Sequence, residues 1–403
     1  MSKVKDLRFK ACSLIFAIFI LLSAVHCLLL AANAKAEDYA VAQGYAHIFN
    51  NNISVYTGVF ALNKDVNLDT SLYFKVTGDS IQGVATTDVS SGASSVTYST
   101  SSDSSISDFR KEVTAGVSRK LGDIADVEFY YDYSEEKDYI STTPSITLKK
   151  ELFEKNTSLI LGYSNNADEI KGRFMDETKG KNTDNYYLGV AQVISPYTIA
   201  QIGYSASRVS GFTSEGIRLV PVDGATKASC VSESATCVEE AFPDSRTRNA
   251  YMLGVNHFFP QNRFGDGYWG LLSLMNKSSI KLFLRYYTDD WGVSSHTEEI
   301  EYNKYLTEET VFKLNFRYYN QSKANFVKDA YAASDKYKVS SPQLVKFNSQ
   351  LAGAKIIHTI KNTSKGSILS FMEDGSVEAK YEFYIQSINV NAHIIMLALR
   401  FVF

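Results

Sequence analysis

The sequence predicts an all-β fold, a transmembrane antiparallel up-and-down β-barrel of about 16 strands (14–18) after an N-terminal signal peptide. Three observations predict this fold. The last strand has one apolar and one mixed face. The first 36 residues have the composition of a secretory signal. Two-faced segments then recur through the rest of the chain, with turn-rich pieces between them.

The C-terminal segment alternates with a period of two, which is typical of a β-strand. Phe403, Phe401 and Leu399 lie on one side, and Arg400 lies on the other. A half-buried strand of a soluble protein would show the same period. A strand that stops on Phe resembles the closing strand of a bacterial outer-membrane barrel. That likeness implies outer-membrane lipid and the barrel-assembly machinery as partners, the latter through the Phe403 strand, and it places Arg400 in the lumen.

The N-terminus predicts export. Basic residues precede an apolar run from Ala11 to Leu30, and Ala34-Lys35-Ala36 supplies a small-x-small cleavage site. We therefore expect a signal peptide at 1–36 and a barrel at 37–403; a retained membrane anchor is the alternative. Removing five basic residues and one acidic residue lowers the formal charge from −3 to −7, which argues against nucleic-acid binding.

The two-faced segments give the strand boundaries. In residues 311–319, for example, Phe312, Leu314 and Phe316 alternate with Lys313 and Arg317. The predicted strands are 38–48, 52–63, 68–80, 108–121, 124–135, 139–151, 156–166, 184–195, 197–208, 246–259, 278–289, 294–305, 309–320, 344–358, 375–387 and 391–403.

Long and short connections alternate along the chain. The long ones are 81–107, 167–183, 209–245 and 321–343, and we expect them on the extracellular side of a barrel. The rival fold is a soluble β-sandwich, which needs one apolar core shared between two sheets. Full charges on one face of strand after strand favour a lipid-facing wall around a wet interior instead.

Cysteine usage agrees with export. The mature chain keeps Cys230 and Cys237 in a polar stretch, where we expect one loop-closing disulfide. Two cysteines alone make a poor metal site, and the sequence predicts no metal and no cofactor. Glu135, Glu136 and Asp138 cluster in a predicted hairpin loop, which is more typical of a solvated acidic loop than of a Ca²⁺ site.

Charged residues on neighbouring strands predict a charge ladder inside the barrel. We expect Arg285 near Glu299 and Glu301 near Lys313, because opposite charges across strands stabilise by about 0.2–1 kcal/mol per pair. The ladder is either a charged constriction that selects solutes or a structural network in a narrow or plugged lumen. Its predicted members are Lys281, Arg285, Glu299, Glu301, Lys313 and Arg317, with Arg246, Arg248 and Arg400 extending it.

Several strings resemble an uncharacterised family of Gram-negative outer-membrane-type β-barrels, known as a domain of unknown function. They are Y-S-E-E-K-D-Y at 133–139, D-S-R-T-R at 244–248 and R-Y-Y-T-D-D-W-G at 285–292. The resemblance implies a barrel in the cell outer membrane and no particular activity. The function we expect is a channel or transporter for small polar solutes. A non-transport surface or structural protein that engages partners through long loops is the alternative.

An outer-membrane hydrolase is the least favoured reading, and we expect no enzymatic activity. Asp289, Asp290, Trp291 and His296 lie together on one hairpin rather than on facing strands. Ser295 and His296 are adjacent on a predicted strand, so their side chains should point to opposite faces.

Overall fold

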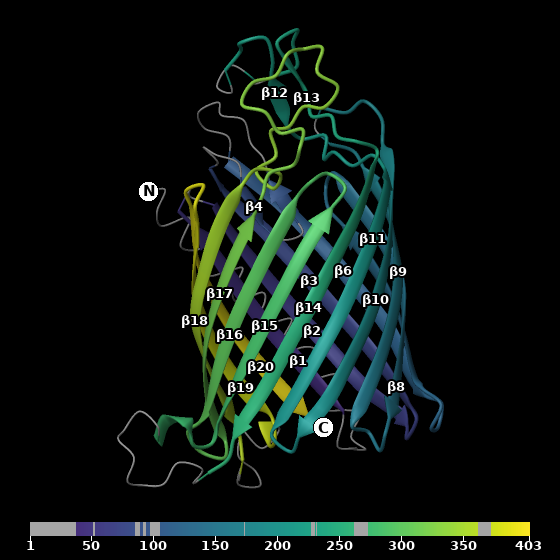
Figure 1. Cartoon of the computed structure of the whole chain (residues 1–403), viewed down its shortest axis with the longest axis vertical. Coiled ribbons are helices and arrows are strands. Elements are labelled where there is room, and N and C mark those ends of the chain that lie inside the picture. Colours follow the sequence, from purple (N-terminus) through teal and green to yellow (C-terminus); the bar gives the residue numbers. More distant parts are fainter. Residues whose placement is uncertain are drawn as a thin grey trace.

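The computed structural model describes residues 38–50, 53–84, 89–91, 94–96, 105–172, 174–226, 230, 232–261, 273–361 and 372–403. Sixteen strands of this part of the chain close into one antiparallel barrel (Figure 1). The predicted signal peptide lies outside the described residues. None of the helices in the described residues is long and apolar enough to cross a membrane.

The barrel strands follow one another in chain order, and β1 closes the barrel against β20. They are β1 (Tyr39–Phe49), β2 (Ile53–Asn67), β3 (Thr70–Val84), β6 (Ser105–Lys120), β7 (Asp126–Glu135), β8 (Tyr139–Leu152), β9 (Thr157–Ile170), β10 (Lys179–Ser195), β11 (Thr198–Gly211), β14 (Ser245–Phe259), β15 (Ser278–Asp289), β16 (Ser294–Tyr305), β17 (Thr310–Gln321), β18 (Phe347–Thr359), β19 (Ser376–Gln386) and β20 (Val390–Val402). Outside the barrel, the described residues form two short hairpins and a 3₁₀ helix: β4 (Val89–Ser91) with β5 (Ser94–Val96), β12 (Leu219–Pro221) with β13 (Cys237–Glu239), and Ser273–Met275.

The predicted fold class and strand order are confirmed, and most strand ends fall within a few residues of the prediction. The largest error is at the start of β10, which begins at Lys179, and β9 extends to Ile170, although 167–183 was expected to be a loop. Asp168 pairs there with Lys181 across the two strands. The prediction was wrong because both faces are polar at this end, so the apolar period stops while the backbone hydrogen bonds continue.

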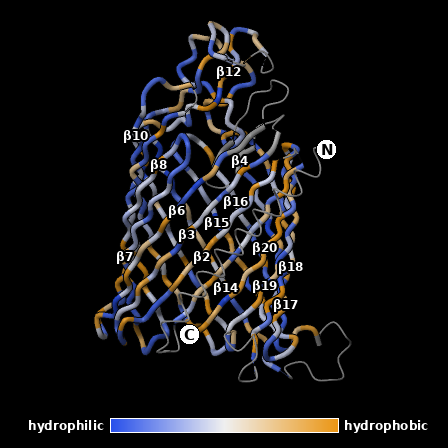
Figure 2. The backbone as a smooth tube through the Cα atoms, turned by 180° about the vertical axis from the view of Figure 1, so that it is seen from behind, coloured by the Kyte–Doolittle hydropathy of each residue, from blue (hydrophilic) through white to orange (hydrophobic). Residues whose placement is uncertain are grey.

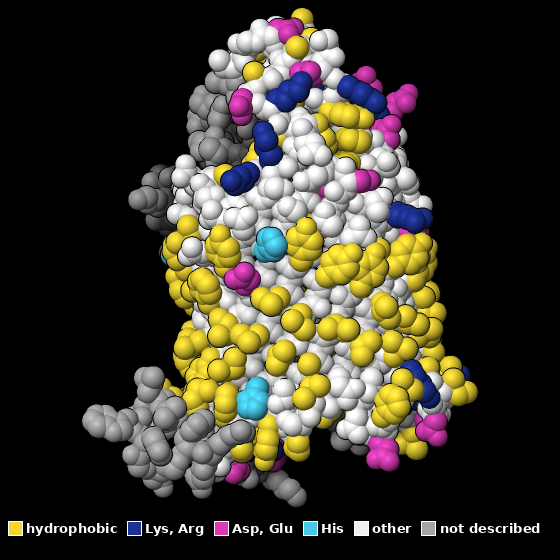
Figure 3. Space-filling view, in the orientation of Figure 1, with side chains coloured by type: hydrophobic (Ala, Val, Ile, Leu, Met, Phe, Trp, Pro, Cys, Tyr) yellow, Lys and Arg dark blue, Asp and Glu magenta, His cyan; other side chains and the backbone are white. Residues whose placement is uncertain are grey.

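The outer wall of the barrel is apolar. Leu282 and Leu284 on β15 and Leu314 and Phe316 on β17 are each more than two-fifths exposed. Figure 2 shows the alternation of apolar and polar residues along the strands, and Figure 3 shows apolar side chains covering the wall in a broad band. An exposed apolar band around a closed barrel is the surface that a lipid bilayer covers.

A row of tyrosines crosses the outer wall toward one end of the barrel. Tyr163 faces Tyr186 across two strands, and Tyr204, Tyr251 and Tyr286 face one another across three. Aromatic rings with a polar tip concentrate where hydrocarbon meets water. The row therefore marks one edge of the apolar band.

Two long loops fold together over that end of the barrel and form what we call the cap, residues 212–244 and 322–346 as far as they are described. Ala241 and Lys338 exchange two backbone hydrogen bonds of 3.0 and 2.9 Å, and Val222 bridges to Tyr331. The cap has an apolar core of its own, to which the β15–β16 hairpin contributes. The core residues are Val220, Val222, Trp291, Val293, Ala324, Tyr331, Val339 and Leu344.

The structure places a disulfide between Cys230 and Cys237 within the cap, and both cysteines are buried. They pack against Leu219 and Phe174. The cross-link and the apolar core together hold the cap in a defined shape above the barrel mouth (Figure 1).

Candidate functional site

The lumen face of β15, β16 and β17 carries a basic–acidic–basic triad. Glu301 lies between two lysines, with its Oε1 3.1 Å from the Nζ of Lys281 and 4.0 Å from that of Lys313. The triad sits at the end of the barrel away from the cap, because Lys281 is near the start of β15. Its three strands hold it in register, as Lys281 is the direct cross-strand partner of Glu301.

The register of the upper part of the ladder differs from the prediction. Arg285 lies opposite Thr297 and not opposite Glu299, whose Cα partners are Phe283 and Arg317. Thr288 pairs with Ser294 across five intervening residues, so Arg285, three residues before Thr288, lies opposite Thr297. Pairing across a hairpin is fixed by such turn geometry, which the alternation alone does not define.

The charged lumen face continues onto β18 and β19. Lys355 pairs with Glu378, and the Nζ of Lys380 lies 2.9 Å from Glu382. The buried Glu382 also accepts a hydrogen bond of 2.9 Å from the Nδ2 of Asn315 on β17. The predicted ladder missed these residues, although the alternation along 377–386 places all three β19 charges on the polar face.

Arg400 lies on the last strand near the closing seam of the barrel. Its guanidinium lies 4.5 Å from the ring centre of Tyr39 on β1. Leu397 and Ile395 are exposed on the opposite face of the same strand. Arg400 therefore belongs to the lumen face, far from the triad's direct contacts.

The opposite wall of the lumen carries its own ion pairs. Arg110 on β6 contacts Asp79 on β3, with Nε and Nη2 distances of 2.7 and 2.5 Å. Lys75 contacts Glu112 at 2.6 Å on the same pair of strands. The lumen is thus lined on both sides by paired charges, which the alternating charges of β3 and β6 would have indicated.

Arginines concentrate at the mouth of the lumen, directly below the cap. Arg246 contacts Asp289 with its Nε at 2.9 Å and its Nη2 at 2.5 Å, and its guanidinium stacks 4.3 Å from the ring of Trp291. Asp289 is buried and also accepts hydrogen bonds from the Tyr287 hydroxyl and the Val293 amide. Arg248 lies on the same face of β14, two residues further along the strand.

Two cavities meet at these arginines. The inner cavity, about 430 Å³, lies against the barrel wall, and the outer cavity, about 410 Å³, lies between the cap and the barrel rim. The two share four lining residues: Arg246, Arg248, Gln343 and Leu344. The cap segment that contributes Gln343 is fixed to the wall, because Gln321 on β17 donates hydrogen bonds to the carbonyls of Gln343 and Val345 at 2.8 and 2.7 Å.

A buried carboxyl group joins the two loops of the cap. Glu240 accepts a hydrogen bond of 2.5 Å from the backbone amide of Ser340. Burial raises the pKa of Glu240 to about 7, and the nearby Arg218 guanidinium opposes this shift. The contact between the two loops therefore includes a group that titrates near neutral pH.

The residues that suggested an enzyme do not meet. His296 is exposed on the outer wall, where its ring lies 5.0 Å from that of Tyr286, whereas Ser295 is buried on the inner face. Asp289 is engaged with Arg246 inside the barrel. The wall of the barrel therefore separates His296 from Ser295 and Asp289.

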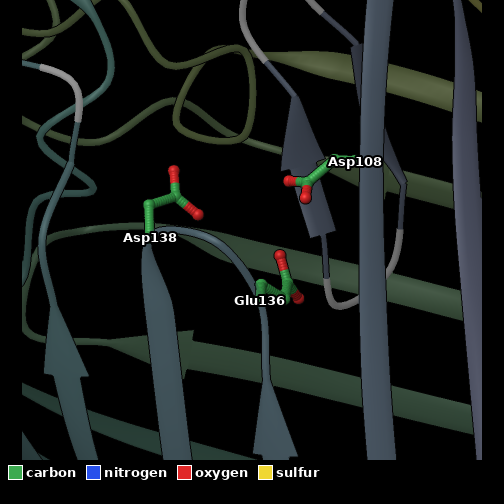
Figure 4. Close-up of side chains that lie close together, drawn as sticks. All are labelled: Asp108, Glu136 and Asp138. Carbon is green, nitrogen blue, oxygen red and sulfur yellow. The ribbon is translucent and has the colours of Figure 1, made fainter.

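Three acidic side chains approach one another at the rim (Figure 4). The carboxylate oxygens of Asp108, Glu136 and Asp138 lie within 4.8 Å of one another. Burial and the neighbouring Asp108 raise the pKa of Asp138. Glu135, which the sequence suggested, instead lies on β7 and is not part of the cluster.

The fold and its lumen define a β-barrel of the transmembrane type. The chain belongs to the family described as "Protein of unknown function (DUF3570)", whose model matches residues 11–179 and 167–387. This membership confirms the family resemblance. A comparison with curated proteins found no match.

Similar folds occur among solved structures. OccD3 (OpdP) of Pseudomonas aeruginosa has 9% identity and a TM-score of 0.46, with 92% of this chain and 93% of that chain covered. A loop-deletion mutant of OmpT of Vibrio cholerae has 10% identity and a TM-score of 0.43, with coverages of 91% and 99%. At these identities and TM-scores the similarity implies nothing about a solute.

Proposed function

We propose that the protein is an outer-membrane channel for small polar solutes whose mouth is covered by the cap. The observation that carries this proposal is the charged interior of a closed sixteen-stranded barrel, which leads to two connected cavities at one end. A barrel of this strand number leaves room for an aqueous channel unless loops fill it. The ion pairs of the lumen would set which charge passes.

The outer wall supports the location. Its apolar band and its tyrosine row fit a bilayer, and the long loops of the cap then lie outside the cell. The partners on this face are outer-membrane lipid and, through the strand that ends at Phe403, the barrel-assembly machinery. Phe403 itself packs beside Leu399 and Phe401 at the end of the barrel opposite the cap.

The cap supports gating rather than a permanently open pore. Its segment around Gln343 lies on the inner wall and lines both cavities. A solute that passes from the outer to the inner cavity must therefore pass Arg246, Arg248, Gln343 and Leu344. Movement of this segment would widen the path.

The folded cap also favours a second candidate function. A cap with an apolar core and a disulfide is a stable surface for partners, as expected of a surface or structural protein. The two functions differ in one measurable property, which is conduction.

Planar-bilayer recording separates them. The test compares residues 37–403 with a variant in which 325–345 is replaced by a short Gly/Ser linker, after circular dichroism has verified the barrel in both. We expect conductance in both proteins and a larger conductance in the shortened one. Equal conductance would remove the cap as a gate. Absence of conductance in both would reject the channel and favour the surface protein.

A further inference from the structure

The inner cavity below the cap has an unusual charge composition. Three of its lining residues are arginines, and none is Asp, Glu or Lys: Ser205, Ser207, Arg246, Arg248, Asn249, Ala250, Arg285, Tyr287, Val293, Ser295, Tyr319, Gln321, Gln343, Leu344 and Phe347. Elsewhere in the described lumen, opposite charges form ion pairs, as between Lys281 and Glu301 and between Arg110 and Asp79. This cavity is therefore the basic part of the route that a solute would take through the lumen.

Only one of the three arginines forms an ion pair with a carboxylate in the described part of the chain. Asp289 balances Arg246. Among the described residues, no carboxylate oxygen forms an ion pair with Arg248 or Arg285. The Nε of Arg248 is buried and has no hydrogen-bond partner in the described part of the chain. The guanidinium of Arg285 lies 5.3 Å from the ring centre of Tyr287.

Asp289 is the cross-strand partner of Arg248, but its carboxylate is already engaged with Arg246. Partly enclosed guanidinium groups without an ion pair of their own are unfavourable, because enclosure removes part of their hydration. An anion between them would restore both the charge balance and the hydrogen bonds. The planar fork of a guanidinium matches a carboxylate with two parallel hydrogen bonds. Arg248 and Arg285 lie on adjacent strands and line the same cavity.

The remaining lining describes the body of the ligand. Leu344, Phe347 and Val293 supply apolar surface, and Ser205 and Ser295 supply hydroxyl groups. A cavity of about 430 Å³ falls in the usual range for small-molecule sites. A simple inorganic ion would leave the apolar side unused, whereas a small organic acid uses both.

We propose that this cavity binds a small organic carboxylate through Arg248 and Arg285, with Arg246 fixed by Asp289 at its entrance. The proposal names the solute class of the channel and in that sense rests on the proposed function. Binding, however, can be measured without conduction, so the two ideas can fail separately.

The test uses the folded 37–403 chain in detergent micelles and isothermal titration calorimetry. Benzoate is the probe, and benzamide is its neutral analogue of nearly equal shape. Arg248→Gln and Arg285→Gln remove one guanidinium each. Arg208→Gln is the matched control, because Arg208 is an exposed arginine at the same end of the barrel and is not part of the cavity lining.

We expect benzoate to bind the unchanged chain and the Arg208→Gln control equally. Each cavity variant should lose affinity about ten- to a hundredfold, the effect of removing hydrogen bonds to a charged group. Benzamide should bind none of them. The site would be overturned if benzoate did not bind the unchanged chain. It would also be overturned if benzoate bound equally well to a variant that carries both Arg248→Gln and Arg285→Gln.

Bilayer recording then distinguishes the site from the channel. Benzoate that binds a non-conducting protein would leave the site standing and remove the channel. If the protein conducts but calorimetry detects no benzoate binding, and benzoate leaves the conductance unchanged, the channel stands and the binding site is rejected.

Discussion

Replacing Trp291 with alanine should detach the cap from the barrel rim. Trp291 is 5% exposed, and its ring lies 5.6 Å from that of Phe242 and 5.3 Å from that of Phe326. Its indole Nε1 donates a hydrogen bond of 2.8 Å to the carbonyl of Ser245 at the start of β14. One side chain on the barrel hairpin thus contacts both loops of the cap.

The size of the effect follows from these contacts. Truncating a buried Trp to Ala costs about 3–5 kcal/mol, and each 1.4 kcal/mol corresponds to about a tenfold change in an equilibrium. The cap should therefore open between about a hundredfold and a few thousandfold more often. Trp291→Phe keeps an aromatic ring and loses the hydrogen bond, so a smaller change is expected, near the 1 kcal/mol typical of a single hydrogen bond.

Native-state hydrogen exchange measures this opening directly. The reporters are three backbone amides with hydrogen bonds inside the cap: Val222, Ala241 and Ala324. Their protection should fall together in Trp291→Ala and much less in Trp291→Phe. The amides of β7, which pair only within the barrel, serve as the internal control and should not change.

Unchanged protection of the cap amides in Trp291→Ala would refute the reasoning, because it would mean that the cap is held by other contacts. A parallel loss of protection in β7 would also contradict it, since the effect would then be global unfolding.

Three further predictions concern pH, selectivity and the disulfide. Burial raises the pKa of Glu240 from 4.5 to about 7. The stability of the cap should therefore be greatest below about pH 4.5 and should fall as pH rises through 7. In hydrogen exchange, Glu240→Gln should flatten this pH profile. Glu301→Gln leaves two lysines without their carboxylate, so the reversal potential in a salt gradient should shift toward anions, and an unchanged potential would remove the triad as a selectivity element. Cys230→Ser should destabilise the β12–β13 hairpin by about 2 kcal/mol, from reopening a short loop, with β12 amide exchange as the readout and unchanged exchange as the contrary result.

The strands were predictable because their physical cause is local. A barrel wall between lipid and water demands a period of two in every strand, as in residues 280–287, where Leu282 and Leu284 alternate with Lys281 and Arg285. This alternation can be recognised in the sequence of a single strand, without knowing which strands it pairs with. It weakened beyond the apolar band, as at β9 and β10, where neither face needs to be apolar.

The candidate site was only partly predictable. The inward direction of Lys281, Glu301 and Lys313 follows from the alternation, and the structure brings these three together. The partner of Arg285 does not follow, because register depends on where each turn closes. The counter-ion of Arg246 was missed as well, since Asp289 reads from the sequence as one of two turn-forming acids.

The sequence by itself therefore determined the sixteen strands, the two faces of each strand and the side of the wall on which each charge lies. Each of these depends on the two-residue alternation within a single strand. Only the tertiary structure decided which charges pair and where the arginines gather. The cap arises from two loops about 80 residues apart that carry no repeating pattern, and it meets the lumen at Gln343 and Leu344. Contacts of that kind depend on how the closed barrel brings distant loops together over one mouth.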